Sequence, residues 1–169
     1  MILSFDIGIK NLSYCILYKD DKYDSINKNN IKIIDWGIIQ LIEDGIKCKN
    51  VPLDKITSIL YNKLHDKFID YDITKVLLEN QPVLKNPLMK SIQMIIYGYF
   101  GYEKNIMGRE LEDIKLINAS NKLKLGKNLK DINNSEDILK IKSKYTRNKK
   151  LAIIYTNHFL KERLIIEDY

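Results

Sequence analysis

The sequence has 169 residues, 45% of them hydrophobic, and a formal net charge of +6, which fits one globular domain and excludes a disordered chain. It contains no run of about 18 uncharged apolar residues and no basic stretch followed by a small-residue cleavage site, so we expect no membrane span and no secretion signal. Two cysteines are too few for a disulfide framework, which favours a reducing, intracellular location.

The first part of the chain is predicted to form three strands. Residues 1–7, 12–18 and 31–39 are rich in apolar and aromatic residues, and the polar stretch 19–30 reads as a turn. The first connection is too short for a crossover helix, so we expect an antiparallel meander.

Helices and strands alternate after the meander. Apolar residues recur at helical spacing in two segments, and short apolar runs mark two further strands. This order predicts an α/β fold with a mixed sheet and helices on both faces. The expected elements are a helix at 53–69, a strand at 75–80, a helix at 88–102 and a strand at 113–119.

Positive charge is concentrated in the last third of the chain. Residues 115–150 contain eleven basic and three acidic side chains, a local net charge of +8, whereas the rest of the chain sums to −2. Periodicity is lost at about 120–146, so we expect a basic loop there, followed by a helix at 147–162. The charge pattern alone fits either a phosphate-contacting surface or a solvated lysine-rich loop.

Two carboxylates occupy equivalent places in the pattern. Asp6 lies near the end of the first predicted strand, before Gly8, and Glu79 lies near the end of the fourth, before Gln81-Pro82. If these strands are parallel neighbours, both acids meet at one sheet edge, where paired oxygen ligands suit Mg²⁺ or Mn²⁺. A glycine there would let a substrate backbone approach. The alternative is ordinary turn chemistry at Asp6 and a salt bridge at Glu79.

Three motifs in order resemble the poxvirus-type Holliday junction resolvases, members of the RuvC-like branch of the ribonuclease H fold. They are "FDIGIKN" near the start, "LLENQP" about seventy residues later, and "YTRNKKLA" at residues 145–152. The segment "IKLINASNKLK" falls where that family has its fifth strand and following loop. The resemblance covers nearly the whole chain and implies a single ribonuclease H-like nuclease domain over residues 1–169.

The resemblance implies a Mg²⁺-dependent endonuclease, with Mn²⁺ as a substitute, that resolves four-way and branched DNA during viral genome processing, in recombination and repair. Asp6 and Glu79 would be the metal-binding catalytic carboxylates, and Lys149 or Lys150 would be the basic residue beside the scissile phosphate. It also implies a homodimer, located in the host-cell cytoplasm or at viral replication sites. The expected DNA-binding residues are Lys10, Asn11, Lys122, Lys124, Arg147, Lys149 and Lys150.

The resembled family ends in a cluster of the form Asp-Asp-x-x-Asp-Ser that completes the metal site. This sequence stops at "LIIEDY", and Glu167 and Asp168 do not match that spacing. Two alternatives follow: a domain truncated at its C-terminal end, or a domain that has lost these ligands. The second predicts a catalytically impaired module that binds branched DNA.

Overall fold

The structure is a computed structural model in which the chain forms two units that are described one at a time. The described residues exclude four segments, namely 21–30, 85, 129–135 and 164–169. Unit 1 comprises Met1–Lys19 and Ile33–Ile117, and unit 2 comprises Asp20–Lys32 and Asn118–Tyr169. The predicted single domain over the whole length stays a prediction.

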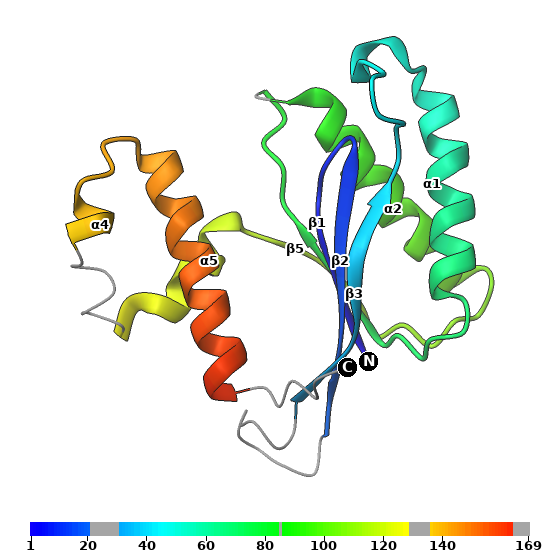
Figure 1. Cartoon of the computed structure of the whole chain (residues 1–169). Coiled ribbons are helices and arrows are strands. Elements are labelled where there is room, and N and C mark those ends of the chain that lie inside the picture. Colours follow the sequence, from blue (N-terminus) through cyan, green and yellow to red (C-terminus); the bar gives the residue numbers. More distant parts are fainter. Residues whose placement is uncertain (21–30, 85, 129–135, 164–169) are drawn as a thin grey trace. The chain divides into compact units, whose positions relative to one another are not determined.

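A five-stranded mixed sheet of order β3-β2-β1-β4-β5 forms the centre of unit 1 (Figure 1). The central strand β1 pairs antiparallel with β2 and parallel with β4, and β4 pairs parallel with β5. The predicted α/β class and mixed sheet are therefore confirmed. The strands are β1 (Ile2–Asp6), β2 (Asn11–Lys19), β3 (Ile31–Gln40), β4 (Lys75–Glu79) and β5 (Asp113–Ile117).

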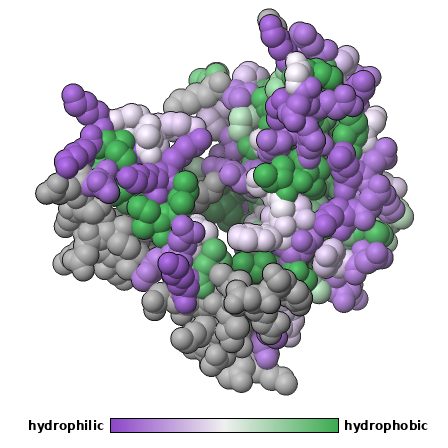
Figure 2. Space-filling view, in the orientation of Figure 1, coloured by the Kyte–Doolittle hydropathy of each residue, from purple (hydrophilic) through white to green (hydrophobic). Residues whose placement is uncertain are grey.

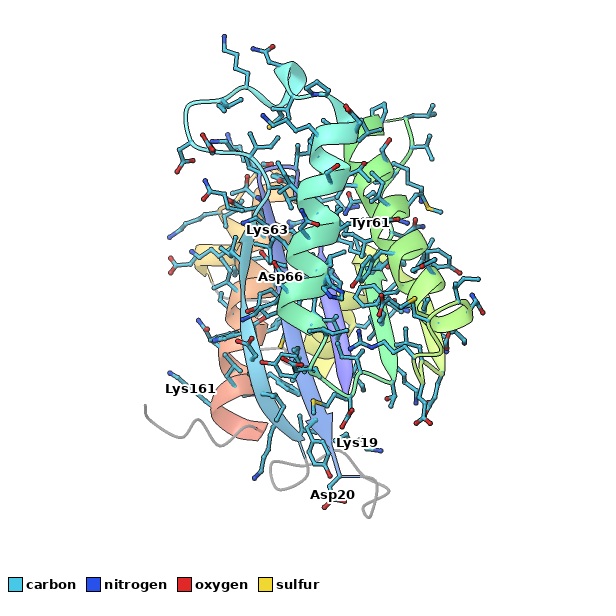
Figure 3. The ribbon with its side chains drawn as sticks, turned by 90° about the vertical axis from the view of Figure 1, so that its right-hand side faces the viewer. Lys19, Asp20, Tyr61, Lys63, Asp66 and Lys161 are labelled. Carbon is cyan, nitrogen blue, oxygen red and sulfur yellow. The ribbon has the colours of Figure 1, made fainter. Side chains whose placement is uncertain are left out.

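Both long helices of unit 1, α1 (Leu53–Phe68) and α2 (Pro87–Asn105), cover the same face of this sheet (Figures 1 and 3). Alternate strand residues point toward them, as the two-residue period of a strand requires. Each buried aliphatic side chain contributes about 1.5–3 kcal/mol by leaving water. The core includes Leu3, Phe5, Leu12, Tyr14, Ile16, Val76 and Leu78 from the strands, and Ile56, Leu60, Leu64, Phe68, Ile92, Ile96 and Phe100 from the helices.

A polar cluster fixes the edge strand β3 to α1. The Asp35 carboxylate accepts hydrogen bonds from the hydroxyls of Tyr14 and Tyr71, at 3.1 and 3.4 Å, and pairs with Lys67 at 2.9 Å. Burial raises the pKa of Asp35, but hydrogen bonds from Lys67 and Tyr14 lower it, and its pKa lies below the usual value. The same carboxylate raises the pKa of Lys67 above its usual range. The pair therefore stays ionised at neutral pH.

The opposite face of β3 is apolar and exposed. Asp35, Gly37 and Ile39 point toward the helices, so the residues between them point the other way. Trp36 and Ile38 are 60% and 65% exposed. Both lie on the sheet face that α1 and α2 leave uncovered.

In unit 2, helices occupy much of the segment for which the sequence predicts a loop. A 3-10 helix, η2 (Ala119–Asn128), overlaps the range 120–146, and a short helix, α4 (Glu136–Leu139), lies within it. The helix α5 (Lys144–Arg163) begins three residues before the expected start at 147, and η2 packs against it. In unit 1, a 3-10 turn, η1 (Cys48–Asn50), was also not predicted from the sequence. Within the described ranges, no helix has both the length and the apolar composition needed to cross a membrane.

Candidate active site

The register of the two central parallel strands places Asp6 and Glu79 at the same level. The ladder between β1 and β4 runs in step up to the pair Phe5 and Leu78, and the next residue on each strand is the carboxylate. Asp6 is the last residue of β1 and Glu79 the last of β4. Adjacent parallel strands lie about 4.8 Å apart, so two carboxylates at one register level are close neighbours along the sheet edge.

Both carboxylates belong to the face that α1 and α2 do not cover. The preceding residues Phe5 and Leu78 are buried against the helices, and side chains alternate along a strand. Asp6 is exposed and Glu79 is half-buried. The two acids are therefore on one face, at one edge, and accessible from solvent. Each also interacts with its surroundings within the structure.

The glycine after Asp6 serves the β1–β2 turn. A Cβ at Gly8 would lie 2.1 Å from the carbonyl oxygen of Asn11, a distance that real atoms do not reach. Only glycine allows the two strands to approach at this turn. This contact between strands is a structural reason for the glycine, and the predicted approach of a substrate backbone at Gly8 stays a prediction.

Lys10 and Asn11 lie at the same turn, shortly after Asp6 in the sequence. The Lys10 ammonium pairs with Asp44 at 3.0 Å, and its backbone carbonyl accepts a hydrogen bond from the Leu41 amide at 2.7 Å. Asn11 is the first residue of β2 and is exposed. Lys10 thus ties the turn to the loop after β3, and the predicted contact of either residue with DNA stays a prediction.

The sequence analysis missed a hydrogen-bond network that holds the segment after Glu79. The buried carbonyl oxygen Oε1 of Gln93 accepts hydrogen bonds from the Gln81 amide at 2.8 Å and from Lys90 Nζ at 3.2 Å. Lys90 also donates to Asn80 Oδ1 at 3.1 Å. Two residues of α2 therefore fix the two positions that follow Glu79, and the Asn80 amide donates to β5 at 2.8 Å.

The predicted basic residues other than Lys10 lie in unit 2. Lys124 on η2 and Lys149 and Lys150 on α5 are exposed, and Arg147 is half-buried. The Lys149 ammonium lies 4.9 Å from the centre of the Tyr145 ring, within the range of a cation–π interaction. Lys122 lies on η2 as well. The expectation that Lys149 or Lys150 acts beside Asp6 and Glu79 joins residues of different units and stays a prediction.

Two carboxylates match the ligand chemistry of Mg²⁺, which in phosphoryl-transfer sites is often held by one or two carboxylates, with water and phosphate oxygens as its other ligands. Across the described part of the chain, no group of three or more His, Cys, Asp or Glu residues is placed to hold a metal. Glu167 and Asp168 lie outside the described residues.

Comparisons with known proteins define the class of this fold. The yeast mitochondrial Holliday junction resolvase Ydc2 aligns over 95% of this chain and 83% of its own, with a TM-score of 0.52 and 17% identity. Thermus thermophilus RuvC, in complex with a Holliday junction substrate, aligns over 95% of this chain and 94% of its own, with a TM-score of 0.51 and 10% identity. The architecture is that of the RuvC-like resolvases.

A family profile described as "Mitochondrial resolvase Ydc2 / RNA splicing MRS1" matches residues 2–92. The chain belongs to this family, and the expected RuvC-like relationship is confirmed. A curated relative, uncharacterized protein L451 of Acanthamoeba polyphaga mimivirus, is 34% identical over 115 residues. The match covers 64% of this chain but only 26% of that relative's length.

Proposed function

We propose that this protein is a Mg²⁺-dependent, structure-selective endonuclease that hydrolyses phosphodiester bonds in four-way and other branched DNA. The observation that carries the proposal is the equal register of Asp6 and Glu79 at the ends of neighbouring parallel strands. Membership in a resolvase family supports the reaction class. The resolvase fold supports branched DNA as the substrate.

Asp6 and Glu79 are the residues of this chain that would hold the metal, with Mn²⁺ as a substitute for Mg²⁺. When bound, such an ion lowers the pKa of water and neutralises charge on a scissile phosphate. The network of Lys90 and Gln93 fixes the chain directly after Glu79, so it keeps this carboxylate at the level of Asp6.

The basic residues of unit 2 would bind the DNA backbone. Lys124, Arg147, Lys149 and Lys150 offer charges and hydrogen-bond donors that suit phosphate and carry no base specificity. Lys149 or Lys150 would also stabilise charge on the scissile phosphate. Binding of this kind weakens steeply as the salt concentration rises.

Cutting both opposed strands of a junction requires two active sites, so we propose a homodimer with one site in each copy. We also propose a role in viral genome processing, through recombination and repair, because a curated relative comes from a mimivirus. The corresponding location is the host-cell cytoplasm or a viral replication site.

The Asp6→Asn variant tests the proposed function. Because it removes a ligand charge without changing side-chain size, we expect cleavage of a synthetic four-way junction to fall by about a hundredfold or more. We expect junction affinity to change by less than about threefold, since backbone contacts dominate affinity. Asp66→Asn, on the exposed side of α1, is the matched control and should cut at the wild-type rate. Wild-type cleavage by Asp6→Asn would refute the proposal.

A second candidate function is binding of branched DNA without cleavage. It is favoured by the absence, among the residues that the structure describes, of a third potential ligand beside the two carboxylates. A gel shift with a four-way junction, run beside a cleavage assay in Mn²⁺, separates the two functions. A shifted band without product supports this candidate, and product formation eliminates it.

A further inference from the structure

Three exposed apolar side chains form a row along the edge strand β3, on the sheet face that α1 and α2 leave uncovered. Ile34, Trp36 and Ile38 are 42%, 60% and 65% exposed. They alternate with residues that point toward the helices, so all three side chains lie on one face. We call these three residues the β3 row. Because contiguous exposed apolar side chains often mark a binding surface, we asked what lies beside this row.

Two contacts establish the register of β3 on its neighbour β2. A Cβ at Gly37 would lie 3.0 Å from the hydroxyl oxygen of Tyr14, and the Leu41 amide donates to the Lys10 carbonyl at 2.7 Å. The later residue on β3 therefore contacts the earlier residue of the β2 side. The two strands run antiparallel, with Gly37 beside Tyr14.

This register brings the β3 row next to the candidate active site. Ile38 lies beside Ser13, and Trp36 lies beside Cys15, because antiparallel neighbours step in opposite directions. The ladder between β2 and β1 pairs Ser13 with Asp6. Ile38, Ser13 and Asp6 therefore form one line across three strands. Strands are spaced about 4.8 Å apart, so the row lies about 10 Å from the strand that carries Asp6.

The side chains between the β3 row and Asp6 are small. Ser13 and Cys15 of β2 and Ser4 of β1 belong to the uncovered face, because the residues next to them are buried against the helices. The Ser4 hydroxyl donates to the Cys15 carbonyl at 3.2 Å, so it is satisfied within the sheet. A nucleotide next to a phosphate at Asp6 could therefore reach the indole of Trp36 along the sheet surface.

We propose that Trp36 stacks on an unpaired base of branched DNA whose scissile phosphate lies at Asp6 and Glu79. The inference rests on the proposed function and assigns the feature of the branch that the protein recognises. A base inside a duplex is covered by its neighbours, whereas a base at a branch point exposes its face. Aromatic side chains bind such a face with little regard to sequence. Stacking on Trp36 therefore selects branched over linear DNA.

The size and chemistry of the β3 row favour a base over a protein partner. Three side chains at about half exposure offer on the order of 300 Å² of surface. A stable protein interface buries about 800 Å² on each partner. The row also carries no charge, so it suits the face of a base better than a phosphate. Ile34 and Ile38, on either side of Trp36 along the strand, extend the apolar surface under that base.

Junction binding by Trp36→Ala, measured without metal, tests the inference. We expect the Kd for a four-way junction to rise about tenfold through the lost stacking contact. The Kd for a linear duplex of the same sequence should change less than about twofold, since phosphate contacts dominate duplex binding. Trp36→Phe keeps an aromatic ring and should stay within about threefold of wild type on the junction.

Tyr18→Ala is the matched control for this measurement. Tyr18 is 43% exposed, and it alternates with the β3-facing residues of β2 so that it belongs to the other face of the sheet. Its loss should leave both dissociation constants unchanged. Circular dichroism establishes that each variant is folded.

Photo-cross-linking of the wild-type chain gives a second measurement that requires no variant. A 5-iodouracil at the branch point should form an adduct with Trp36 on irradiation, identified by mass spectrometry, whereas the same base in the middle of an arm should not. Adducts that avoid Trp36, equal losses on junction and duplex, or unchanged junction binding by folded Trp36→Ala would each overturn the inference. Junction cleavage with unchanged affinity in that variant would leave the proposed function standing, whereas a wild-type chain that binds no junction would refute both.

Discussion

The helices α1 and α2 pack on the same face of the same sheet, yet their outer surfaces are of different kinds. Lys63 and Asp66 of α1 are exposed, whereas the ring of Tyr61 packs edge-on against Tyr99 of α2 with the ring centroids 5.2 Å apart (Figure 3). The space-filling view shows a largely hydrophilic surface over α1, on its right-hand side (Figure 2). The exposed side chains of α2 include Met94, Tyr97 and Tyr102, and no charged residue lies between Ser91 and Tyr102. The inner faces of both helices form the core, whereas their outer faces differ in charge.

The two helices also hold different parts of the sheet. Lys67 of α1 binds Asp35 on the edge strand β3. Lys90 and Gln93 of α2 bind the residues that follow Glu79. Accordingly, both helices contribute to the core, and α2 also connects the core to the candidate site.

The largest expected effect tests whether α1 and α2 contribute to one common hydrophobic core. Leu60 of α1 and Ile96 of α2 are both fully buried, so replacing either by alanine should lower the free energy of unfolding by about 2–5 kcal/mol. Urea unfolding at one fixed protein concentration measures both. Lys63→Ala, on the exposed side of α1, should change the value by less than about 0.5 kcal/mol. A small loss at Leu60 alone would mean that α1 does not contribute to a common core.

The next largest effect concerns the hydrogen-bond network of Gln93 on α2. Gln93→Leu leaves the buried Gln81 amide without its acceptor, which should lower the free energy of unfolding by about 1–3 kcal/mol. If the proposed function holds, cleavage should fall about tenfold while junction affinity stays the same, since the segment after Glu79 loosens. Gln93→Glu retains the acceptor oxygen and should recover most of both losses. Equal stability of Gln93→Leu and wild type would show that the network contributes nothing.

A pH experiment tests the contact of α1 with β3. The pKa of Asp35 is lower in the folded than in the unfolded protein, so its contribution is present above the unfolded pKa of about 4 and is lost as the pH falls through the folded value. Asp35→Asn should therefore cost about 1 kcal/mol at pH 7, a modest figure because Lys67 is 41% exposed. The difference from wild type should shrink at pH 3. A difference that grows on acidification would contradict the ion pair.

The smallest effect concerns Gly98 of α2. Gly98→Ala should raise the free energy of unfolding by about 0.5–1 kcal/mol, because alanine favours helix and fits the open space. Gly45→Ala is the opposite control: Gly45 has a φ of +83°, so alanine there should lower the value by about 1 kcal/mol. Thermal unfolding at several protein concentrations measures both changes.

The sequence predicts the sheet and both helices of unit 1 because burial produces periodic patterns. The strand and helix positions from β1 to β5 agree with the structure to within a few residues. The sequence also predicts that Asp6 and Glu79 meet at one sheet edge if their strands are parallel neighbours. In the structure β1 and β4 are parallel neighbours, and each ends in one of the two acids. The helical structure of η2 and the first turn of α5 were not predicted, because the many lysine and asparagine residues in this basic segment obscure the apolar periodicity of a helix.

Contacts between distant residues could not be predicted from such patterns. Gln93 and Lys90 bind Asn80 and Gln81 through a turn whose path no local signal specifies. The steric need for glycine at position 8 was also not predicted, since the nearness of the Asn11 carbonyl depends on how the two strands close. One local signal of this hydrogen-bond network was available: Gln93 is an uncharged polar residue on the buried side of a predicted helix, where it needs a hydrogen-bond partner.

The position of Trp36 makes the exposed sheet face observable. It is the single tryptophan of the chain, 60% exposed on β3, and shares the uncovered face of the sheet with Asp6 and Glu79. Indole emission depends on the surroundings of the ring, so its wavelength and intensity change when the water around the ring is replaced. The unlabelled protein therefore contains one intrinsic fluorophore, and titration with a nucleic acid would report whether anything settles on that side of the molecule.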